Sequence, residues 1–261
     1  LFCYDAPCVE ACPTGIDIPL FIRQINNGNV SGAARTIYNA NYFGNICGKV
    51  CPTEVLCEGA CVYNNQNVKP IEIGRLQSYA TTSTIKKNKQ LYKPAPPTGK
   101  RIAVIGAGPA GLSCACELRL KGHEVDVFEA DTKPSGLTYY GIAPYKIRNE
   151  EVFEEMNYLE STFGYAIEYE HRIDAEERNT ILEQYDAVMI GIGLGGTSET
   201  DLPGEHLPGC IGATEFIRNL KTKAPAVEVG NHVVVLGGGN TAMDAASESA
   251  RMGAESVVLA Y

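Results

Sequence analysis

The sequence predicts an α/β protein in which a small, Cys-rich helical segment precedes two units of strand, glycine turn and helix. Three observations support this fold class. Seven of the ten cysteines fall within residues 1–61, a short apolar run followed by glycines begins at residue 101, and a similar run begins at residue 232. Short apolar runs before a glycine turn and a helix are typical of buried parallel strands. The expected domains are residues 1–93, 94–228 and 229–261.

The composition is that of a globular protein, with 44% hydrophobic and 20% charged residues. A net charge of −9 argues against binding to nucleic acid, because no basic surplus is present to neutralise phosphates. No apolar run is long enough for a membrane span, and no signal peptide is recognised. The chain starts without Met inside a cysteine group, as expected of a fragment. We expect a cytoplasmic protein.

The cysteines before residue 62 form two groups. The first contains Cys3, Cys8 and Cys12, and the second contains Cys47, Cys51, Cys57 and Cys61. Pro follows Cys12 and Cys51, which is typical of ferredoxin-like iron–sulfur runs. Zinc sites favour closer Cys-x2-Cys pairs, and no His precedes residue 123. A disulfide framework lacks a secretion signal. Iron–sulfur binding is therefore favoured over zinc and over plain buried thiols.

Short helices are expected around these cysteines. Asp17 is suited to cap a helix that carries Pro19 in its first turn, and Ser31 to cap a second helix. Residues 70–84 indicate a third helix. A charged, Pro-rich stretch from Lys86 to Pro97 then marks a domain boundary.

Residues 101–129 form the segment around which the chain is organised. A strand over residues 102–105 is followed by the G-x-G-x-x-G spacing, a helix over 112–120, and a second strand over 124–128. In a Rossmann-like unit these glycines allow a tight turn, a close approach of pyrophosphate and close packing of the helix on the strand. The residues expected at the nucleotide are Gly106, Ala107, Gly108, Pro109, Ala110, Gly111 and the ribose-binding acid Glu129.

The stretch between the two units carries further structural signals. Residues 134–144 suit a loop beside a flat ligand, on which Tyr139 and Tyr140 could stack, although half-buried loop tyrosines are an equal alternative. Residues 150–164 show the apolar periodicity of an amphipathic helix. Residues 185–193 indicate a buried strand that ends in a glycine turn at the carboxyl edge of the sheet, where Gly193 is a further expected cofactor contact.

A second Rossmann-like unit begins at residue 232. A strand over 233–236 leads into G-x-G-x-x-A, a helix over 243–252 and a strand over 257–261. Its expected nucleotide contacts are Gly237, Gly238, Gly239, Asn240 and Thr241. The residues that would separate NAD from NADP lie beyond this strand. Tandem units of this kind indicate a flavin and a nicotinamide nucleotide held face to face. No catalytic acid–base pair is expected, because hydride transfer needs positioning.

The cysteine runs also resemble a known family. Cys3-Tyr-Asp-Ala-Pro-Cys8, Cys47-Gly-Lys-Val-Cys51-Pro-Thr and Ile73-Gly-Arg-Leu-Gln77 are similar to the N-terminal part of dihydropyrimidine dehydrogenase, in particular the flavin subunit of its two-subunit form. The glutamate synthase small subunit is a more distant relative with the same layout. The resemblance covers essentially the whole chain.

This resemblance implies two [4Fe–4S] clusters. One would be held by Cys3, Cys8, Cys61 and a Cys three positions before Cys3, and the other by Cys12, Cys51, Cys57 and Gln77. Cys47 belongs to neither set. The resemblance also implies FAD at Gly106–Gly111, Glu129, Gly136, Leu137 and Lys146, and NAD(P)H at Gly237–Thr241. Ser135 departs from the pattern, since many relatives have Gly there.

The implied function is electron input, from NAD(P)H through FAD and the two clusters to a partner subunit. That partner would carry FMN and reduce uracil or thymine at the 5,6 bond. The alternatives are a glutamate synthase small subunit or a related NAD(P)H:acceptor oxidoreductase, and a non-catalytic assembly module of a larger redox complex.

Overall fold

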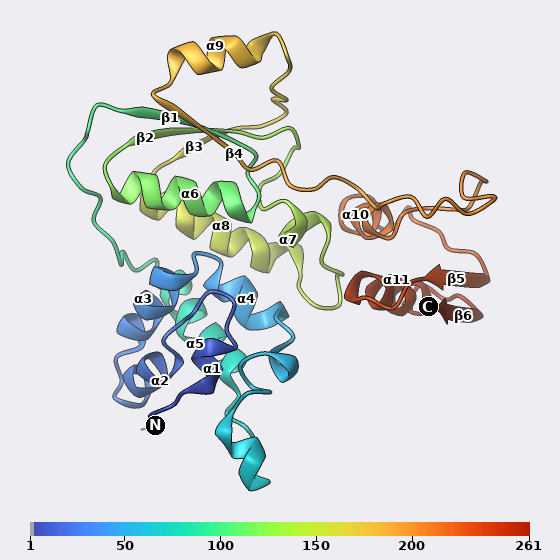
Figure 1. Cartoon of the computed structure of the whole chain (residues 1–261), viewed down its shortest axis with the longest axis horizontal. Coiled ribbons are helices and arrows are strands. Elements are labelled where there is room, and N and C mark those ends of the chain that lie inside the picture. The colour runs from blue at the N-terminus through green and yellow to red at the C-terminus, as the bar shows by residue number, and fades with distance from the viewer. Residues whose placement is uncertain (1–2) are drawn as a thin grey trace.

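A computed structural model describes residues 3–261 (Figure 1). The first part is a bundle of short helices: α1 (Pro7–Glu10), α2 (Ile18–Asn26), α3 (Val30–Ala40), α4 (Gly44–Val50), the 3-10 turns η1 (Thr53–Val55) and η2 (Val62–Gln66), and α5 (Ile73–Lys86). Its core joins α2, α3 and α5 through Phe21, Ile37, Ile73 and Ala80. The all-α architecture predicted for this segment is therefore present.

Side-chain caps set where two of these helices begin. Asp17 Oδ1 accepts a hydrogen bond from Leu20 N at 3.0 Å and starts α2, as predicted. The cap predicted at Ser31 is wrong. Asn29 Oδ1 instead accepts from Gly32 N at 3.0 Å, so Ser31 lies inside α3. Asn caps a helix as well as Ser does, and the earlier of two suitable residues is used.

A four-stranded parallel sheet forms the middle of the chain. Its strands are β1 (Arg101–Ile105), β2 (Glu124–Phe128), β3 (Ala166–Glu168) and β4 (Ala187–Ile190), in the order β3-β2-β1-β4. The helices α6 (Pro109–Leu120) and α8 (Asn149–Phe163) cover one face, and α9 (Glu177–Gln184) covers the other (Figure 1). Side chains alternate accordingly: Val104 packs in the core with α6 and α8, whereas Ala103 packs with Ile181 of α9.

A second parallel sheet consists of β5 (His232–Leu236) and β6 (Ser256–Ala260), connected by α11 (Asn240–Arg251). The helix α10 (Ala213–Lys223) packs against α11, and Ile217, Val235 and Ala245 share their core. The predicted order of strand, helix and strand thus occurs twice, and each element begins and ends within a few residues of its predicted range. Between residues 3 and 261, none of the helices combines the length and the apolar character needed to cross a bilayer.

The helical bundle lies against the α6–α8 face of the four-stranded sheet unit (Figure 1). Tyr38, Phe43 and Ile46 belong to the same buried cluster as Leu112 and Leu159. The linker that follows α5 is also attached, since Tyr158 donates from its hydroxyl to Lys89 O at 2.9 Å. The two parts of the chain therefore share one apolar interface.

Candidate nucleotide and iron–sulfur sites

The first glycine turn is tightly built. Gly106 has a φ of 102° and donates from its N to Phe128 O at 2.7 Å, so the turn stays in register with β2. A Cβ at Gly111 would lie 1.9 Å from Gly106 O, which explains why the helix can pack here only on glycine. Gly108 precedes α6 without a side-chain cap, and the next residues, Pro109 and Ala110, are exposed. The open helix start suits a phosphate group.

Glu129 is held against this turn. Its Oε2 accepts from Ala107 N at 2.7 Å, and its Oε1 accepts from Asp131 N at 2.8 Å. The side chain is buried, with 8% of its surface exposed. Each carboxylate oxygen retains a lone pair, so the acid is oriented by the backbone and can still accept a ribose hydroxyl.

The loop after Glu129 returns to the same place. Ser135 N donates to Ala107 O at 2.7 Å, and a Cβ at Gly136 would lie 3.0 Å from Gly108 Cα. Ser135 is buried with a φ of 86°, a backbone conformation that glycine adopts at lower cost. This is the position at which the sequence departs from the family pattern. Gly136 thus approaches the turn, and Leu137 next to it is exposed.

Tyr139 and Tyr140 lie in a short helix, α7 (Leu137–Tyr140), rather than in a loop. Both are buried, with their ring centroids 4.6 Å apart, and Tyr139 also packs on Phe153 of α8. Apolar packing against α8 takes up the Tyr139 ring, which favours the alternative of a packed tyrosine, whereas stacking on a flat ligand stays a prediction. The guanidinium of Arg218 lies 4.1 Å from the centre of the Tyr140 ring.

Two predicted flavin contacts lie apart from the turn. Lys146 Nζ is 2.6 Å from Asp244 of α11, and Tyr145 donates from its hydroxyl to the same carboxylate at 2.7 Å. Beyond β4, it is Gly191 that touches the turn, since its N donates to Ile105 O at 2.8 Å. Gly193 follows with a φ of 74° and open space around it. Flavin contact by Lys146 and Gly193 stays a prediction.

The second glycine turn repeats the geometry of the first. Gly237 has a φ of 117° and donates from its N to Ala260 O at 2.7 Å, as Gly106 does to Phe128 O. Gly239 precedes α11 with the same extended backbone that Gly108 shows before α6. The turn is open to ligand, since Gly238, Gly239, Asn240 and Thr241 are all exposed.

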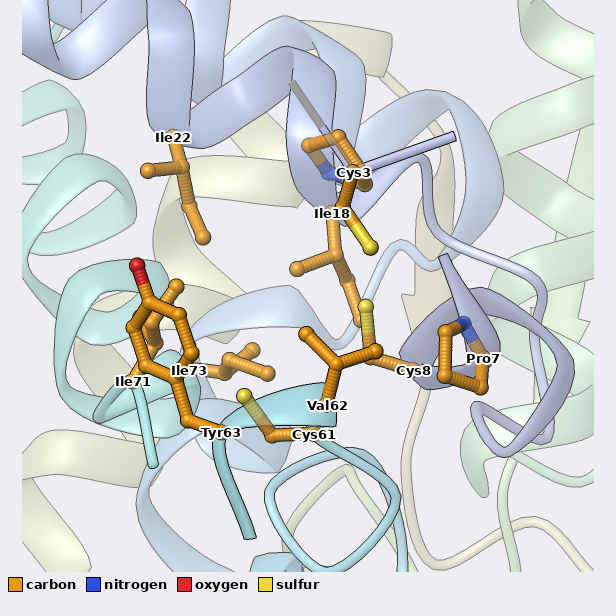
Figure 2. A pocket seen from close by; sticks show the side chains of 11 residues that line it. Cys3, Pro7, Cys8, Ile18, Ile22, Cys61, Val62, Tyr63, Ile71 and Ile73 are labelled. Carbon is orange, nitrogen blue, oxygen red and sulfur yellow. The ribbon is translucent and has the colours of Figure 1, made fainter. Parts of the chain in front are cut away.

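One set of predicted metal ligands surrounds an apolar cavity in the helical bundle. Cys3, Cys8 and Cys61 line it together with Ile18, Ile22, Ile71 and Ile73, and their sulfur atoms point into the same space (Figure 2). Burial, with a contribution from Cys3 and Cys61, raises the pKa of the Cys8 thiol. Bound iron would reverse that effect, because metal ligation requires the thiolate.

The second predicted set lies around the end of α4. Burial raises the pKa of Cys57 to about 11, with a further contribution from neighbouring Cys12. A hydrogen bond from Cys47 lowers the pKa of Cys51, against the effects of burial and of Cys12 and Cys57. Cys12 thus contributes to the pKa shifts of both Cys51 and Cys57, which indicates that the three side chains lie near one another. Cys47 contacts Cys51 from outside the set.

Gln77 is buried on α5 beside this site. Its Nε2 donates to Gly44 O at 2.8 Å, and its Cγ would lie 3.2 Å from a Cβ at Gly48. Its Oε1 has no hydrogen-bond partner among residues 3–261, so the oxygen is available to a metal.

For the described part of the chain, no three His, Cys, Asp or Glu side chains converge closely enough to hold one metal ion. The cysteines of a [4Fe–4S] cluster bind different irons and therefore stand farther apart than the ligands of one ion. A Cys-rich, largely apolar cavity suits such a cluster.

The sequence analysis missed Glu155 and Asp244. Both are buried acids that join distant segments. Glu155 lies three residues after Val152 on the apolar stripe of α8, and this spacing was a signal that the acid would be buried. No comparable signal marks Asp244 as the partner of Tyr145 and Lys146.

Comparison with known families gives two matches. Residues 1–89 match the family described as dihydropyrimidine dehydrogenase domain II, 4Fe-4S cluster, which confirms the prediction of an iron–sulfur domain. Residues 100–261 match the family described as pyridine nucleotide-disulphide oxidoreductase. Together the two matches cover both predicted kinds of site.

Individual relatives agree with these families. The chain is 34% identical to the NAD-dependent dihydropyrimidine dehydrogenase subunit PreT of Escherichia coli K12, over 98% of this chain and 62% of PreT. It is 35% identical to the small chain of NADPH glutamate synthase of Halomonas elongata, over 100% of this chain and 57% of the relative. This chain therefore spans less than two thirds of the length of either.

This chain is also similar to a solved structure, the His57Gln mutant of FprA from Mycobacterium tuberculosis. The similar region covers 63% of this chain and 43% of the FprA chain. The TM-score is 0.50 at 25% sequence identity. This similarity supports the assignment of the α/β architecture.

Proposed function

Because the chain belongs to the pyridine nucleotide-disulphide oxidoreductase family, we propose that it is the electron-input part of an NAD(P)H-dependent flavin and iron–sulfur oxidoreductase. One observation carries this proposal. A single chain combines two glycine turns of matching geometry with two sets of cysteines in an adjoining helical domain. Such a combination suits an enzyme that accepts electrons in pairs and releases them singly.

The proposed division of labour follows the three segments of the chain. Residues 1–93 hold two [4Fe–4S] clusters, residues 94–228 hold FAD, and residues 229–261 begin the NAD(P)H-binding part. Support for the last assignment comes from Gly237, whose turn repeats that of Gly106. The PreT relative, described as a dehydrogenase subunit, supports a division of the whole enzyme between subunits.

In this proposal the chain binds and orients its cofactors. The open start of α6 accepts the flavin pyrophosphate, and Glu129, fixed by Ala107 N, accepts the ribose hydroxyls. The exposed turn at Gly238–Thr241 accepts the nicotinamide dinucleotide. When bound, the flavin converts a two-electron donor into one-electron steps that the clusters carry. No side chain of this chain has to act as an acid or base.

The proposed electron acceptor is an FMN-containing subunit that reduces uracil or thymine at the 5,6 bond. Support comes from the match of residues 1–89 to a dihydropyrimidine dehydrogenase domain and from the similarity to PreT. The glutamate synthase small chain is the second candidate, supported by an equal level of identity. We place the enzyme in the cytoplasm, because cysteines that hold iron–sulfur clusters have to stay reduced and disulfides form mainly in oxidising compartments.

Cofactor analysis tests the proposal directly. The full-length protein, purified anaerobically, should contain FAD and about eight irons with matching acid-labile sulfide. It should reduce a dye with NADH or NADPH. Addition of the FMN subunit should give uracil reduction, whereas glutamate formation with a glutamate synthase large chain would favour the second candidate. Protein without flavin and iron would instead support an assembly module.

A cysteine variant refines this test. Cys57→Ser should reduce the iron content to about four per chain, because one set loses a ligand. Cys210→Ser is the matched control, since Cys210 is exposed and remote from both sets. Equal iron in the two variants would contradict the assignment of Cys57.

A further inference from the structure

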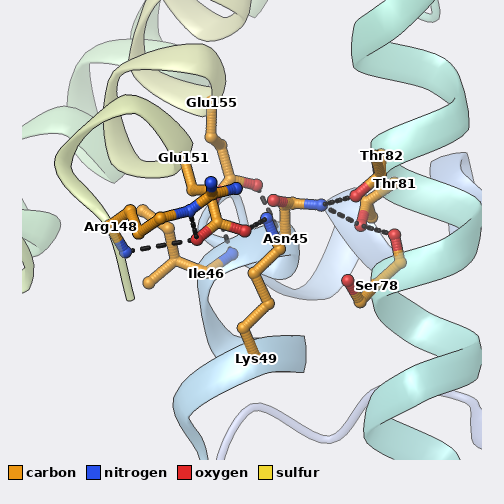
Figure 3. A network of polar contacts seen from close by, with 9 residues as sticks. All are labelled: Asn45, Ile46, Lys49, Ser78, Thr81, Thr82, Arg148, Glu151 and Glu155. Carbon is orange, nitrogen blue, oxygen red and sulfur yellow. Dashed lines mark hydrogen bonds and ion pairs between the residues drawn. The ribbon is translucent and has the colours of Figure 1, made fainter. Parts of the chain in front are cut away.

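Glu155 is a fully buried acid at the interface of the two parts of the chain. It belongs to α8, and none of its side chain is exposed. Its carboxylate receives three hydrogen bonds from the helical bundle: Asn45 N to Oε1 at 2.7 Å, Ile46 N to Oε2 at 2.9 Å, and Tyr38 hydroxyl to Oε1 at 3.0 Å (Figure 3 shows the backbone contacts). Burial of an acid is costly without such partners. The hydrogen bonds of this buried carboxyl group therefore all come from residues of α3 and α4.

The titratable side chains that face Glu155 are uncharged at neutral pH. Burial raises the pKa values of Tyr38, Tyr158 and Cys116. The pKa of Cys47 is also raised, mainly by its hydrogen bond with Cys51 and secondly by burial. Besides burial, the main contributions to the pKa of Glu155 come from Ile46, Asn45, Tyr38 and Cys47, and none of these is a cation. Hydrogen bonds from Asn45 N, Ile46 N and the Tyr38 hydroxyl thus hold the carboxyl group.

The segment that Glu155 holds is also the segment that orients Gln77. Gly44 O accepts from Gln77 Nε2 at 2.8 Å. The next residue, Asn45, donates from Nδ2 to the hydroxyls of Thr81 and Thr82 of α5, at 2.9 and 2.7 Å (Figure 3). Glu155, the start of α4 and the helix of Gln77 therefore form one continuous hydrogen-bonded network.

The other end of α4 leads directly to the second set of cysteines. The helix ends at Val50, and Cys51 is its C-cap residue. Cys51 N donates to Cys47 O at 3.0 Å, and Cys47 N donates to Phe43 O at 2.9 Å, so backbone hydrogen bonds connect the start of α4 to Cys51. One acid thereby controls two predicted ligands of the same site, through the helix and through the amide of Gln77.

We infer that Glu155 is a positioning residue for the site of Cys12, Cys51, Cys57 and Gln77, because it fixes the Gly44–Ile46 segment that presents Gln77 Oε1 and anchors α4. The inference rests on the proposed function for the presence of a cluster. Glu155 touches no predicted ligand and acts only through the network. Its position on α8 also ties this site to the flavin-binding unit.

Glu155→Gln is the decisive substitution. It preserves the size of the side chain but replaces one acceptor oxygen with an NH2 group, which then faces Asn45 N or Ile46 N, both donors. The matched control is Glu154→Gln on the same helix. The side chain of Glu154 is exposed and makes no hydrogen bond or ion pair within the described residues. Glu151 is unsuitable because it pairs with Lys49 of α4 at 3.1 Å (Figure 3).

Both variants are to be prepared anaerobically in the full-length protein, and their iron, flavin and low-temperature EPR spectra compared. Glu155→Gln should retain flavin and the EPR signal of the Cys3, Cys8 and Cys61 site, while the signal and midpoint potential of the second site shift. Glu154→Gln should match the wild type. Unchanged signals in Glu155→Gln would overturn the inference, whereas wild-type protein without iron would overturn the proposed function instead.

A double variant separates positioning from general stabilisation. If Glu155 acts partly through Gln77, the EPR change in the combination of Gln77→Ala with Glu155→Gln should be smaller than the sum of the changes in the two single variants. Fully additive changes would refute the route through Gln77. If Glu155→Gln does not fold, Tyr38→Phe removes one of the three hydrogen bonds and keeps the carboxylate. Tyr38→Phe must then shift the second signal alone, and a wild-type spectrum would refute the inference.

Discussion

Two alanine substitutions in the first glycine turn should separate folding from nucleotide binding. In Gly111→Ala the new Cβ would meet Gly106 O at 1.9 Å, far inside the 3.0 Å limit of real contacts, so β1 and α6 must separate. Backbone overpacking of this kind costs about 3 kcal/mol. The higher helix propensity of Ala stabilises the folded state by about 1 kcal/mol relative to Gly. A net loss of about 2 kcal/mol lowers the unfolding midpoint by about 4–8 °C in a chain of this size.

Gly108→Ala is the matched substitution. Gly108 has a φ of −76° and a ψ of 179°, which any residue adopts, and a Cβ there would lie 4.0 Å from its nearest neighbours. The unfolding free energy should therefore change by less than about 0.5 kcal/mol. The methyl group would, however, occupy the approach of the pyrophosphate, so FAD affinity should fall at least about tenfold.

The assays are thermal unfolding of flavin-free protein, followed by tyrosine fluorescence, and titration with FAD, followed by quenching of flavin fluorescence. Gly111→Ala should change the first measurement and Gly108→Ala the second. Equal destabilisation of the flavin-free protein by both substitutions would refute the distinct roles assigned to the two glycines. Unchanged FAD affinity in Gly108→Ala would refute the placement of the pyrophosphate.

Three further outcomes are expected. Burial raises the pKa of Glu155 from its ordinary 4.5 to about 8, so the folded state retains a proton that the unfolded state releases. Unfolding free energy should fall as pH rises from about 4.5 to about 8, and chemical denaturation should show a weaker pH dependence in Glu155→Gln. Asp244→Asn removes the ion pair with Lys146 and should cost about 1–2 kcal/mol, a loss that 0.5 M salt reduces, in the same denaturation assay. The pKa of His171 is raised first by its hydrogen bond with Glu168, so Glu168→Gln should lower it, as measured by NMR titration; an unchanged value would contradict that contact.

Local signals predicted most of the secondary structure. The strand over 124–128 and the helix over 150–164 appear almost at the expected residues, because apolar period and glycine turns are encoded within a few neighbouring positions. The cap at Ser31 was wrong because Asn29 offers the same chemistry two residues earlier. Which of two suitable residues caps a helix is decided by tertiary packing, and the local sequence pattern carries no information about that packing.

Contacts between distant segments were the harder part of the site. The turn at Gly106 and Glu129 was predictable, since a strand–helix–strand unit brings these residues together by its own connectivity. Lys146 is different. Its pairing with Asp244 depends on how the second sheet unit lies against the loop before α8, and no periodicity expresses that arrangement. Packing of Tyr139 against α8 was hidden for the same reason.

The interface at Glu155 has a consequence for how the protein is made. The partners of this acid precede it by 109 to 117 positions, so the ribosome delivers the helical bundle long before its last anchoring group. Domains generally fold in the order of synthesis. Until α8 has been synthesised, the peptide N–H groups of Asn45 and Ile46 therefore remain hydrogen-bonded to water, and the interface of the helical bundle stays incomplete. Maturation of the Gln77 site is then tied to completion of the neighbouring unit, and a prematurely terminated chain would leave that site unfinished.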